Sequence, residues 1–109
     1  MKNKDFQLVY KKGKSNANKY LIMYILENNK TENRLGISVS KKVGNSVVRH
    51  RITRLIREVY RLNISHFKSG YDIVIIARAS AKDKSYREIE SALIHLAKLH
   101  YIIEELSEI

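Results

Sequence analysis

The basic side chains of residues 41–61 have the chemistry to bind phosphate groups. This stretch reads KKVGNSVVRHRITRLIREVYR, and its only acidic residue is Glu58. A planar guanidinium can donate to two phosphate oxygens at once and can also stack on a base. Such a run is often merely the solvated face of a helix, but here almost no acid balances the charge. The composition of the stretch therefore favours an interface for a polyanion such as a nucleic acid.

Four aromatic side chains near lysines offer a second kind of chemistry. They are Phe6, Tyr10, Tyr20 and Tyr24. Aromatic rings beside basic residues can stack on unpaired bases. The alternative is that these rings belong to the core or the rim of a small domain, and the residues alone favour that alternative.

Residues that could catalyse hydrolysis are scarce. His50 is surrounded by cations and has no nearby carboxylate to orient it as a general base. His95 and His100 are five residues apart in an expected helix, so they point in different directions. The sequence also lacks an acidic cluster near the basic residues and a glycine-rich phosphate-binding loop. We therefore expect neither a catalytic residue nor a metal site in this protein.

The net charge of the 109 residues is +10, and it is concentrated in two blocks. Residues 34–61 carry eight Lys or Arg and one Glu, whereas residues 1–20 carry six Lys and one Asp. The remaining segments are close to neutral. Two concentrated blocks create a directed positive field that attracts polyanions, and solubility alone would not require them.

The length and composition limit the other possibilities. A chain of 109 residues is expected to form a single domain, residues 1–109, around one modest core. The absence of cysteine excludes thiolate metal sites and suits the reducing cytoplasm. No apolar run of about 18 residues and no signal-peptide segment occurs, so we expect neither a membrane span nor secretion.

The arginines after Gly44 are expected to lie on one long helix at residues 45–64. Its apolar positions recur at helical spacing and should form a buried stripe, which consists of Val48, Ile52, Leu55, Val59 and Leu62. On a helical wheel the opposite face carries His50, Arg54, Arg57 and Arg61, flanked by Arg49 and Arg51. Gly44, Asn45 and Ser46 should supply the turn before this helix and a capping side chain, and the free N–H groups of the first turn add to an anion site beside Lys41 and Lys42.

A short helix and two strands are expected before the basic segment. Residues 5–12 have helical spacing, and the helix should end at the following glycine. Residues 20–26 are apolar and aromatic enough for a strand, and residues 34–40 alternate cleanly. The polar turn between them favours an antiparallel hairpin, with a possible extra strand at residues 14–17.

A central strand and a final helix are expected after the basic segment. Residues 71–78 are almost continuously apolar, as in a strand buried on both faces. Ser85 and Glu88 form a plausible capping box at the start of the last helix. Its buried stripe should consist of Ile89, Leu93, Leu96 and Ile103. The whole pattern, α-β-β-(β)-α-β-α, predicts a single α+β two-layer sandwich with a small central sheet.

The two predicted hairpin strands have faces of different composition. In residues 34–40 one face is apolar and should pack on the core, and the other carries small residues. The apolar positions are Leu35, Ile37 and Val39, and the small ones are Gly36, Ser38 and Ser40. In residues 20–26 both faces are apolar. Either one face is a sheet surface left for a ligand or helices cover both faces, and the pattern alone does not decide.

The run RLGISVSKKVGNSVVRHRITRLIREVYR closely resembles the signature of the protein subunit of bacterial ribonuclease P. That signature combines a strand ending in Ser-x-Lys-Lys, a Gly-Asn turn, and a helix with Arg-Asn-Arg and further arginines. The segments DFQLVYKKGKSNAN and YDIVIIARASA resemble the first helix and the last strand of the same family. The resemblance covers nearly the whole chain. Two departures are His50 in place of the usual Asn and Thr53 in place of a frequent Lys.

The resemblance implies that an RNA is the catalyst and that this protein assists it. The ribonuclease P holoenzyme is an endonuclease that removes the 5′ leader of precursor tRNA with Mg²⁺, which the RNA subunit and the substrate mainly hold. The expected partners are therefore the catalytic RNA and precursor tRNA, without DNA or a membrane, in the cytoplasm. The family fold also implies a left-handed βαβ crossover, whereas right-handed crossovers are the rule.

The resemblance also implies two sites. The residues that bind the catalytic RNA would be Lys41, Lys42, Asn45, Arg49, His50, Arg51, Arg54 and Arg57. The cleft for the single-stranded leader would be lined by Phe6, Tyr10, Tyr20, Ile22, Tyr24, Ser38 and Ser40. Two other functions stay open on the residues alone: a general RNA-binding or ribosomal protein, and a nuclease that acts without an RNA subunit.

Overall fold

The computed structural model describes residues 1–104. The elements in chain order are α1 (Asn3–Lys12), β1 (Lys14–Ala17), β2 (Leu21–Glu27), β3 (Arg34–Ser38), α2 (Ser46–Asn63), η1 (Ile64–His66), β4 (Tyr71–Ala77), η2 (Ala79–Ala81) and α3 (Tyr86–Leu99). The predicted series of helices and strands is confirmed, and α1 begins two residues earlier than expected. Within residues 1–104, none of the helices combines the length and the apolar character that crossing a bilayer requires.

The sheet contains four strands in the order β1-β2-β4-β3. The predicted hairpin between residues 20–26 and 34–40 is wrong, because β4 lies between β2 and β3. Instead, β2 pairs antiparallel with both β1 and β4, while β3 pairs parallel with β4. A parallel pair requires a long crossover, and α2 supplies it. The possible extra strand, β1, is therefore the hairpin partner of β2.

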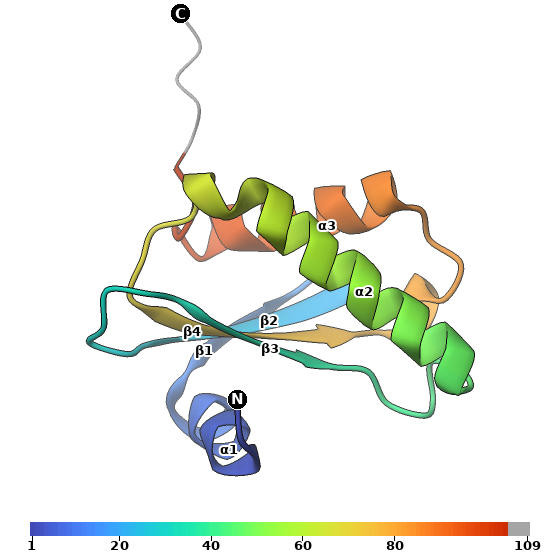
Figure 1. Ribbon diagram of the computed structural model, residues 1–109, viewed down its shortest axis with the longest axis horizontal. Coiled ribbons are helices and arrows are strands. Elements are labelled where there is room, and N and C mark those ends of the chain that lie inside the picture. The colour runs from blue at the N-terminus through green and yellow to red at the C-terminus, as the bar shows by residue number, and fades with distance from the viewer. Residues whose placement is uncertain (105–109) are drawn as a thin grey trace, which may run out of the picture.

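Helices cover both faces of this sheet. The α+β class is confirmed. The prediction had two layers, whereas the structure has a third, because α1 covers the second face of the sheet. Helices α2 and α3 lie over one face, and α1 lies against the other (Figure 1). Strand β4 is buried on both sides, since Ile73 and Ile75 belong to the main core under α2 and α3, whereas Val74 is fully buried on the α1 side. This explains why its sequence is almost uniformly apolar.

The buried face of α2 is turned relative to the predicted stripe. The helix begins and ends within one residue of the predicted bounds. Ile52 and Val59 are fully buried as expected, whereas Leu62 is 56% exposed. Ile56 and Tyr60, which the predicted stripe omits, are buried instead. The physical reason is that α2 packs on α3 as well as on the sheet, so its buried face is shared between two partners.

The last helix is shorter than predicted. The capping box at its start is confirmed, but α3 ends at Leu99. Tyr101 adopts a left-handed backbone conformation, with φ of 60°, and the chain then returns along the protein. Ile103 is buried as predicted, yet it lies outside the helix in an antiparallel bridge with Phe67. Its burial therefore comes from this bridge and not from a helical stripe.

Candidate nucleic-acid interface

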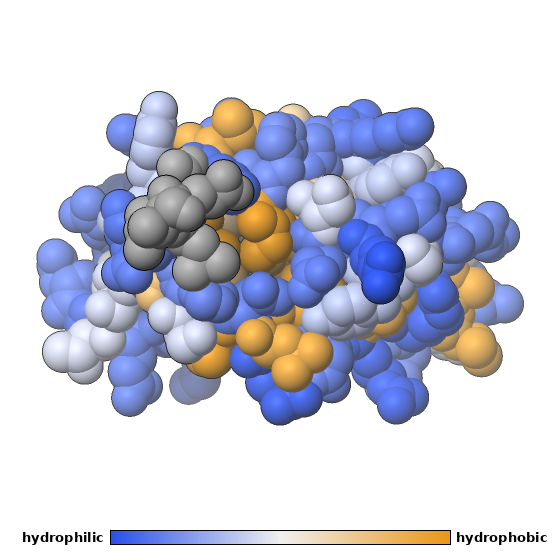
Figure 2. Space-filling view, turned by 90° about the horizontal axis from the view of Figure 1, so that it is seen from above, coloured by the Kyte–Doolittle hydropathy of each residue, from blue (hydrophilic) through white to orange (hydrophobic). Residues whose placement is uncertain are grey.

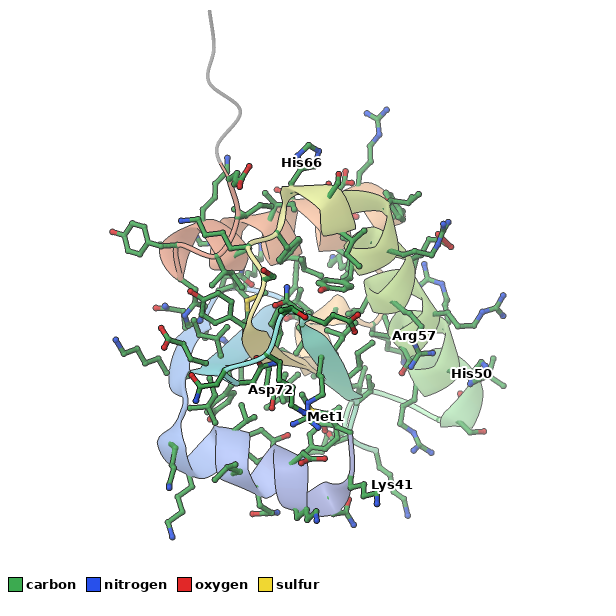
Figure 3. The ribbon with its side chains drawn as sticks, turned by 60° about the vertical axis from the view of Figure 1, so that its left-hand side comes forward. Met1, Lys41, His50, Arg57, His66 and Asp72 are labelled. Atoms are coloured by element: carbon green, nitrogen blue, oxygen red, sulfur yellow. The ribbon has the colours of Figure 1, made fainter. Side chains whose placement is uncertain are left out.

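The basic residues of α2 lie on the side of the helix that faces away from the core. His50, Arg54 and Arg57 are exposed, and the labelled His50 lies at the outer edge of the molecule in Figure 3. The start of the helix is as predicted, because the Oδ1 atom of Asn45 accepts a hydrogen bond from the N–H of Val48 at 3.0 Å. This cap determines where the helix begins and thus which side chains share its exposed face.

Few acidic groups neutralise these cations. The first turn of α2 contains no acid, and within residues 1–104 the only ion pair on this helix joins Arg61 to Glu58. Seen from above, on the side of α2 and α3, most of the surface is hydrophilic (Figure 2). The guanidinium groups of Arg54 and Arg57 are therefore available to an external anion such as a phosphate.

Arg49 and Arg51 are held differently from their neighbours on α2. Arg51 donates hydrogen bonds to the backbone carbonyl oxygens of Lys84 at 3.0 Å and Lys82 at 3.5 Å. Arg49 is half-buried, and within residues 1–104 its buried Nε atom has no hydrogen-bond partner. Arg51 therefore ties α2 to the segment before α3, a structural role that the sequence pattern did not indicate.

The loop that carries Lys41 and Lys42 connects β3 to α2. Both lysines are exposed. The side chain of Val43 is only 3% exposed and anchors the loop to the core, and its N–H donates to the carbonyl oxygen of Ser40 at 3.1 Å. In Figure 3, Lys41 lies closer to α1 than His50 does. The loop thus extends the positive charge of α2 toward the α1 side of the molecule.

Aromatic residues of α1 pack on the sheet face opposite α2. Tyr10 meets Tyr24 of β2 edge-on, with ring centroids 5.1 Å apart, and Phe6 lies 6.2 Å from Tyr10. Gly36 of β3 permits this approach, because a Cβ atom there would lie 2.7 Å from the Phe6 ring. All three rings are half-buried. They lie together on one face of the sheet, the face on which the family resemblance would place them.

Three half-buried side chains form a row across the same sheet face. They are Ile22 of β2, Ile76 of β4 and Ser38 of β3, which the strand registers place side by side. Ile22 and Ser38 are predicted members of this face. Ile76 is an addition that a uniformly apolar strand did not reveal. Ile76 lies two positions after Val74 in the same strand, so both side chains point to the same face of the sheet. This spacing would have identified Ile76 once Val74 was known to face α1.

Two predicted members of this face lie elsewhere. Tyr20 precedes β2, and its hydroxyl group donates a hydrogen bond to Glu88 of α3 at 3.5 Å, on the opposite side of the sheet. Strand alternation does not extend to Tyr20, because the side chain of Asn18 accepts from the N–H groups of Tyr20 and Leu21 and turns the chain there. Ser40 is exposed in the loop after β3, where strand geometry no longer directs its side chain.

An ion pair between a partly exposed arginine and a buried aspartate lies under α1 beside the rings. The guanidinium of Arg34 donates to the carboxylate of Asp72 at 2.9 and 2.6 Å, and the amide of Asn28 donates to the same carboxylate at 3.0 Å. Arg34 also lies 3.5 Å from Asp5 of α1. Asp72 is 3% exposed, and the hydrogen bonds from Arg34 hold its pKa below the usual range. The cluster joins β3, β4 and α1 (Asp72 is labelled in Figure 3).

The donor chemistry of the described residues does not fit a resident metal ion. Residues 1–104 contain no group of three His, Cys, Asp or Glu side chains that could hold one. The carboxylates of Asp5 and Asp72 are close to Arg34, whose charge opposes that of a cation in the same place. The interface therefore consists of cations and aromatic rings rather than metal ligands.

A model of the Ribonuclease P family matches residues 1–100. The chain belongs to this family. The ribonuclease P protein component of Lachnoclostridium phytofermentans is 69% identical over 101 residues, which cover 93% of this chain and 87% of the relative. That of Alkaliphilus metalliredigens is 59% identical over 97 residues, which cover 89% of this chain and 87% of the relative.

Solved ribonuclease P proteins share the fold. The protein from Staphylococcus aureus superposes with a TM-score of 0.88 at 44% identity, and the alignment covers 95% of each chain. The protein from Thermotoga maritima superposes with a TM-score of 0.82 at 32% identity, and the alignment covers 87% of this chain and 90% of the Thermotoga maritima chain. As a protein component of ribonuclease P, the chain has an RNA partner and takes part in processing the 5′ leader of tRNA. The enzyme is a metal-dependent ribonucleoprotein endoribonuclease.

Proposed function

We propose that the exposed face of α2 and the loop before it hold the catalytic RNA of ribonuclease P. The observation that carries this proposal is the set of exposed guanidinium groups on α2, of which only Arg61 is ion-paired among residues 1–104. The proposed contacts are Lys41, Lys42, Asn45, Arg49, His50, Arg51, Arg54 and Arg57. Arg54 and Arg57 are the strongest members, because neither the core nor another element uses their side chains.

We further propose that the face between α1 and the sheet receives the single-stranded 5′ leader of precursor tRNA. Its proposed lining is Phe6, Tyr10, Ile22, Tyr24, Ser38 and Ile76, with Ser40 at the rim. Half-buried rings offer stacking surfaces to unpaired bases, and the small side chains of β3 let a backbone approach the sheet closely. Tyr20 is excluded, because its side chain lies against α3.

The metal of the reaction is proposed to be Mg²⁺, held mainly by the RNA subunit and the substrate. Magnesium ions favour phosphate and water oxygens and are rarely enclosed by protein ligands alone. The protein would instead contribute positive charge and positioning, as one RNA-binding domain in the cytoplasm, where bacterial precursor tRNA is made. Catalytic residues would belong to the RNA and not to this chain.

Reconstitution with the organism's own catalytic RNA tests this proposal. The protein alone is expected to leave precursor tRNA uncut, and the RNA with the protein should cleave it at a Mg²⁺ concentration at which the RNA alone is slow. Cleavage by the protein without RNA would support a self-sufficient nuclease. If the protein does not stimulate its own catalytic RNA and binds unrelated RNAs equally strongly, the result would support a general RNA-binding protein.

A further inference from the structure

A second aromatic and basic surface lies on the sheet face opposite the proposed leader face. The segment at residues 18–20 and residues 87–95 of α3 border an open surface cavity of about 370 Å³. Tyr20, Lys19 and Arg87 line it, and Lys84 lies close to the Tyr20 ring. Cavities that bind small molecules begin at about 300 Å³, so this one has room for a base. We call Tyr20, Lys19, Lys84 and Arg87 the Tyr20 site.

The backbone of the Tyr20 site is held firmly. Asn18 fixes the segment to α3, because its amide donates to the carbonyl oxygen of Ala92 at 2.8 Å. Arg78 fixes it to the end of β4, since its guanidinium donates to the carbonyl oxygen of Asn18 and its backbone N–H to that of Tyr20, each at 2.9 Å. The hydroxyl of Ser80 donates to the carbonyl oxygen of Lys19. The ring is therefore presented on a rigid support.

Cations surround this ring. The ammonium groups of Lys84 and Lys19 lie 5.4 and 5.7 Å from the centre of the Tyr20 ring. Arg87 lines the same cavity, and within residues 1–104 none of these three cations forms an ion pair. The one acid at the cavity, Glu88, is engaged by the capping box, and hydrogen bonds from Ser85 lower its pKa. The local field is thus positive around an aromatic face.

The Tyr20 site is continuous with the basic face of α2. Arg51 of α2 donates to the backbone carbonyl oxygens of Lys82 and Lys84, so the segment before α3 lies directly beside the helix. Helix α1, in contrast, lies on the other face of the sheet (Figure 1). An RNA strand that extends from α2 over the segment before α3 therefore approaches Tyr20, whose ring lies beside Lys84.

We propose that the Tyr20 site binds one unpaired nucleotide of the catalytic RNA. The base stacks on the Tyr20 ring, and Lys19, Lys84 and Arg87 contact the flanking phosphates. The inference rests on the proposed function, because it requires that α2 holds the same RNA. It adds an anchor on the α3 side of the molecule, on the face that does not carry the proposed leader contacts.

The test compares Tyr20→Ala with Tyr20→Phe in the holoenzyme reconstituted with the organism's catalytic RNA. The phenyl ring keeps the stacking surface and loses only the long contact to Glu88, so Tyr20→Phe should bind the RNA as the parent does. Tyr20→Ala should lose roughly tenfold in affinity, as expected for one stacked base. Lys84→Gln should reduce the slope of log affinity against log salt by about 0.7 to 0.9, the value of one phosphate contact.

Two further measurements separate this proposal from a structural role and from the proposed function. Thermal unfolding of the free Tyr20→Ala protein shows whether the fold is intact, and a photo-crosslinking side chain at position 20 reports the neighbouring RNA directly. A crosslink to an unpaired segment of the catalytic RNA supports the Tyr20 site. A crosslink to precursor tRNA, or none at all, overturns it. If Arg54→Ala weakens RNA binding while Tyr20→Ala and the crosslink show nothing, the Tyr20 site fails and the proposed function stands.

Discussion

Arginines on the two faces of the sheet use their charge in opposite ways. On the α2 side, the guanidinium groups of Arg54 and Arg57 are exposed and available. On the α1 side, Arg34 is bound to Asp72, which is 3% exposed, and also approaches Asp5. The first arrangement leaves charge for a partner, whereas the second uses charge to hold the protein together.

This difference teaches how the same residue type serves binding or architecture. A single helix positions the α2 arginines, so each is expected to act nearly independently and to respond to salt. Three elements position the α1 face, so a change in its ion pair should alter stability and the geometry of the rings together. The five predictions below test this contrast.

The largest effect is expected from Asp72→Asn. The substitution leaves Arg34 without its carboxylate partner, and we expect the free energy of unfolding to fall by about 2 to 4 kcal/mol. The loss is smaller than for a fully buried unpaired charge, because Arg34 keeps contact with water. Urea unfolding at neutral pH measures this change. Asp83→Asn, at an exposed position, is the matched control and should change the free energy of unfolding by less than about 0.5 kcal/mol.

The same variant should have a different acid response. The pKa of Asp72 is lower in the folded protein than its ordinary value of 3.8, so the ionised carboxylate favours folding at any pH above that value. This contribution is lost as the pH falls through the folded-state pKa. The parent should therefore lose more stability on acidification below pH 3.8 than Asp72→Asn does. Identical acid profiles would show that the ion pair does not anchor this face.

Arg54→Ala and Arg57→Ala should give the next largest effect, on RNA binding rather than on stability. Each removes charge-assisted hydrogen bonds worth about 1.5 to 3 kcal/mol, so affinity for the catalytic RNA should fall roughly tenfold or more. The salt slope should decrease by about 0.7 to 0.9 for each arginine. Arg61→Ala is the control, because Arg61 is already paired with Glu58, and its loss should be smaller. Equal losses at all three positions would mean that pairing does not distinguish them.

Tyr24→Ala should affect substrate choice and leave assembly unchanged. If an unpaired base of the leader stacks on this ring, its removal should reduce the preference for leader-bearing over leaderless tRNA by roughly tenfold. Part of any loss in stability comes from the contact with Tyr10, which is worth about 0.5 to 1.5 kcal/mol. Tyr24→Phe keeps the ring and should keep the preference. Weaker assembly with an unchanged preference would contradict the proposed division between the two faces.

The smallest effect is expected from Asn45→Ala. Loss of the cap to the N–H of Val48 should lower the free energy of unfolding by about 1 kcal/mol. Asn45→Ser keeps a capping oxygen and should restore most of it. Chemical denaturation of both variants measures the difference. A loss of RNA affinity in Asn45→Ala that Asn45→Ser does not repair would indicate that the amide itself contacts RNA.

The long helix was the most predictable element. Its bounds follow from Asn45 and from the apolar spacing, and its basic face follows from the helical period. Its buried face was less predictable, because Ile56 and Tyr60 are buried partly by packing on α3. A periodic pattern shows that a helix has an apolar face, but it does not show how many neighbours share that face.

The sheet was the least predictable part. Two strands separated by a short polar turn normally form a hairpin, yet β4 separates β2 from β3. Strand pairing joins residues far apart in the chain, and β2 is apolar on both faces, so several pairings would bury similar surface. The family resemblance, with strand alternation, also placed Tyr20 on the wrong face, because an Asn18 turn ends the alternation just before β2 begins.

The sequence by itself determined the features that depend on neighbours within one helical turn. These include the capping box of α3, the position of α2 and the concentration of positive charge on its exposed face. Only the tertiary structure decided which strands pair, that Arg51 binds the segment before α3, and that Arg34 is neutralised by Asp72 while Arg54 is not. The physical reason is that local hydrogen bonds are set by a few adjacent residues, whereas the partners of β4, Arg51 and Arg34 lie more than 30 positions away in the chain and meet only after the sheet has formed.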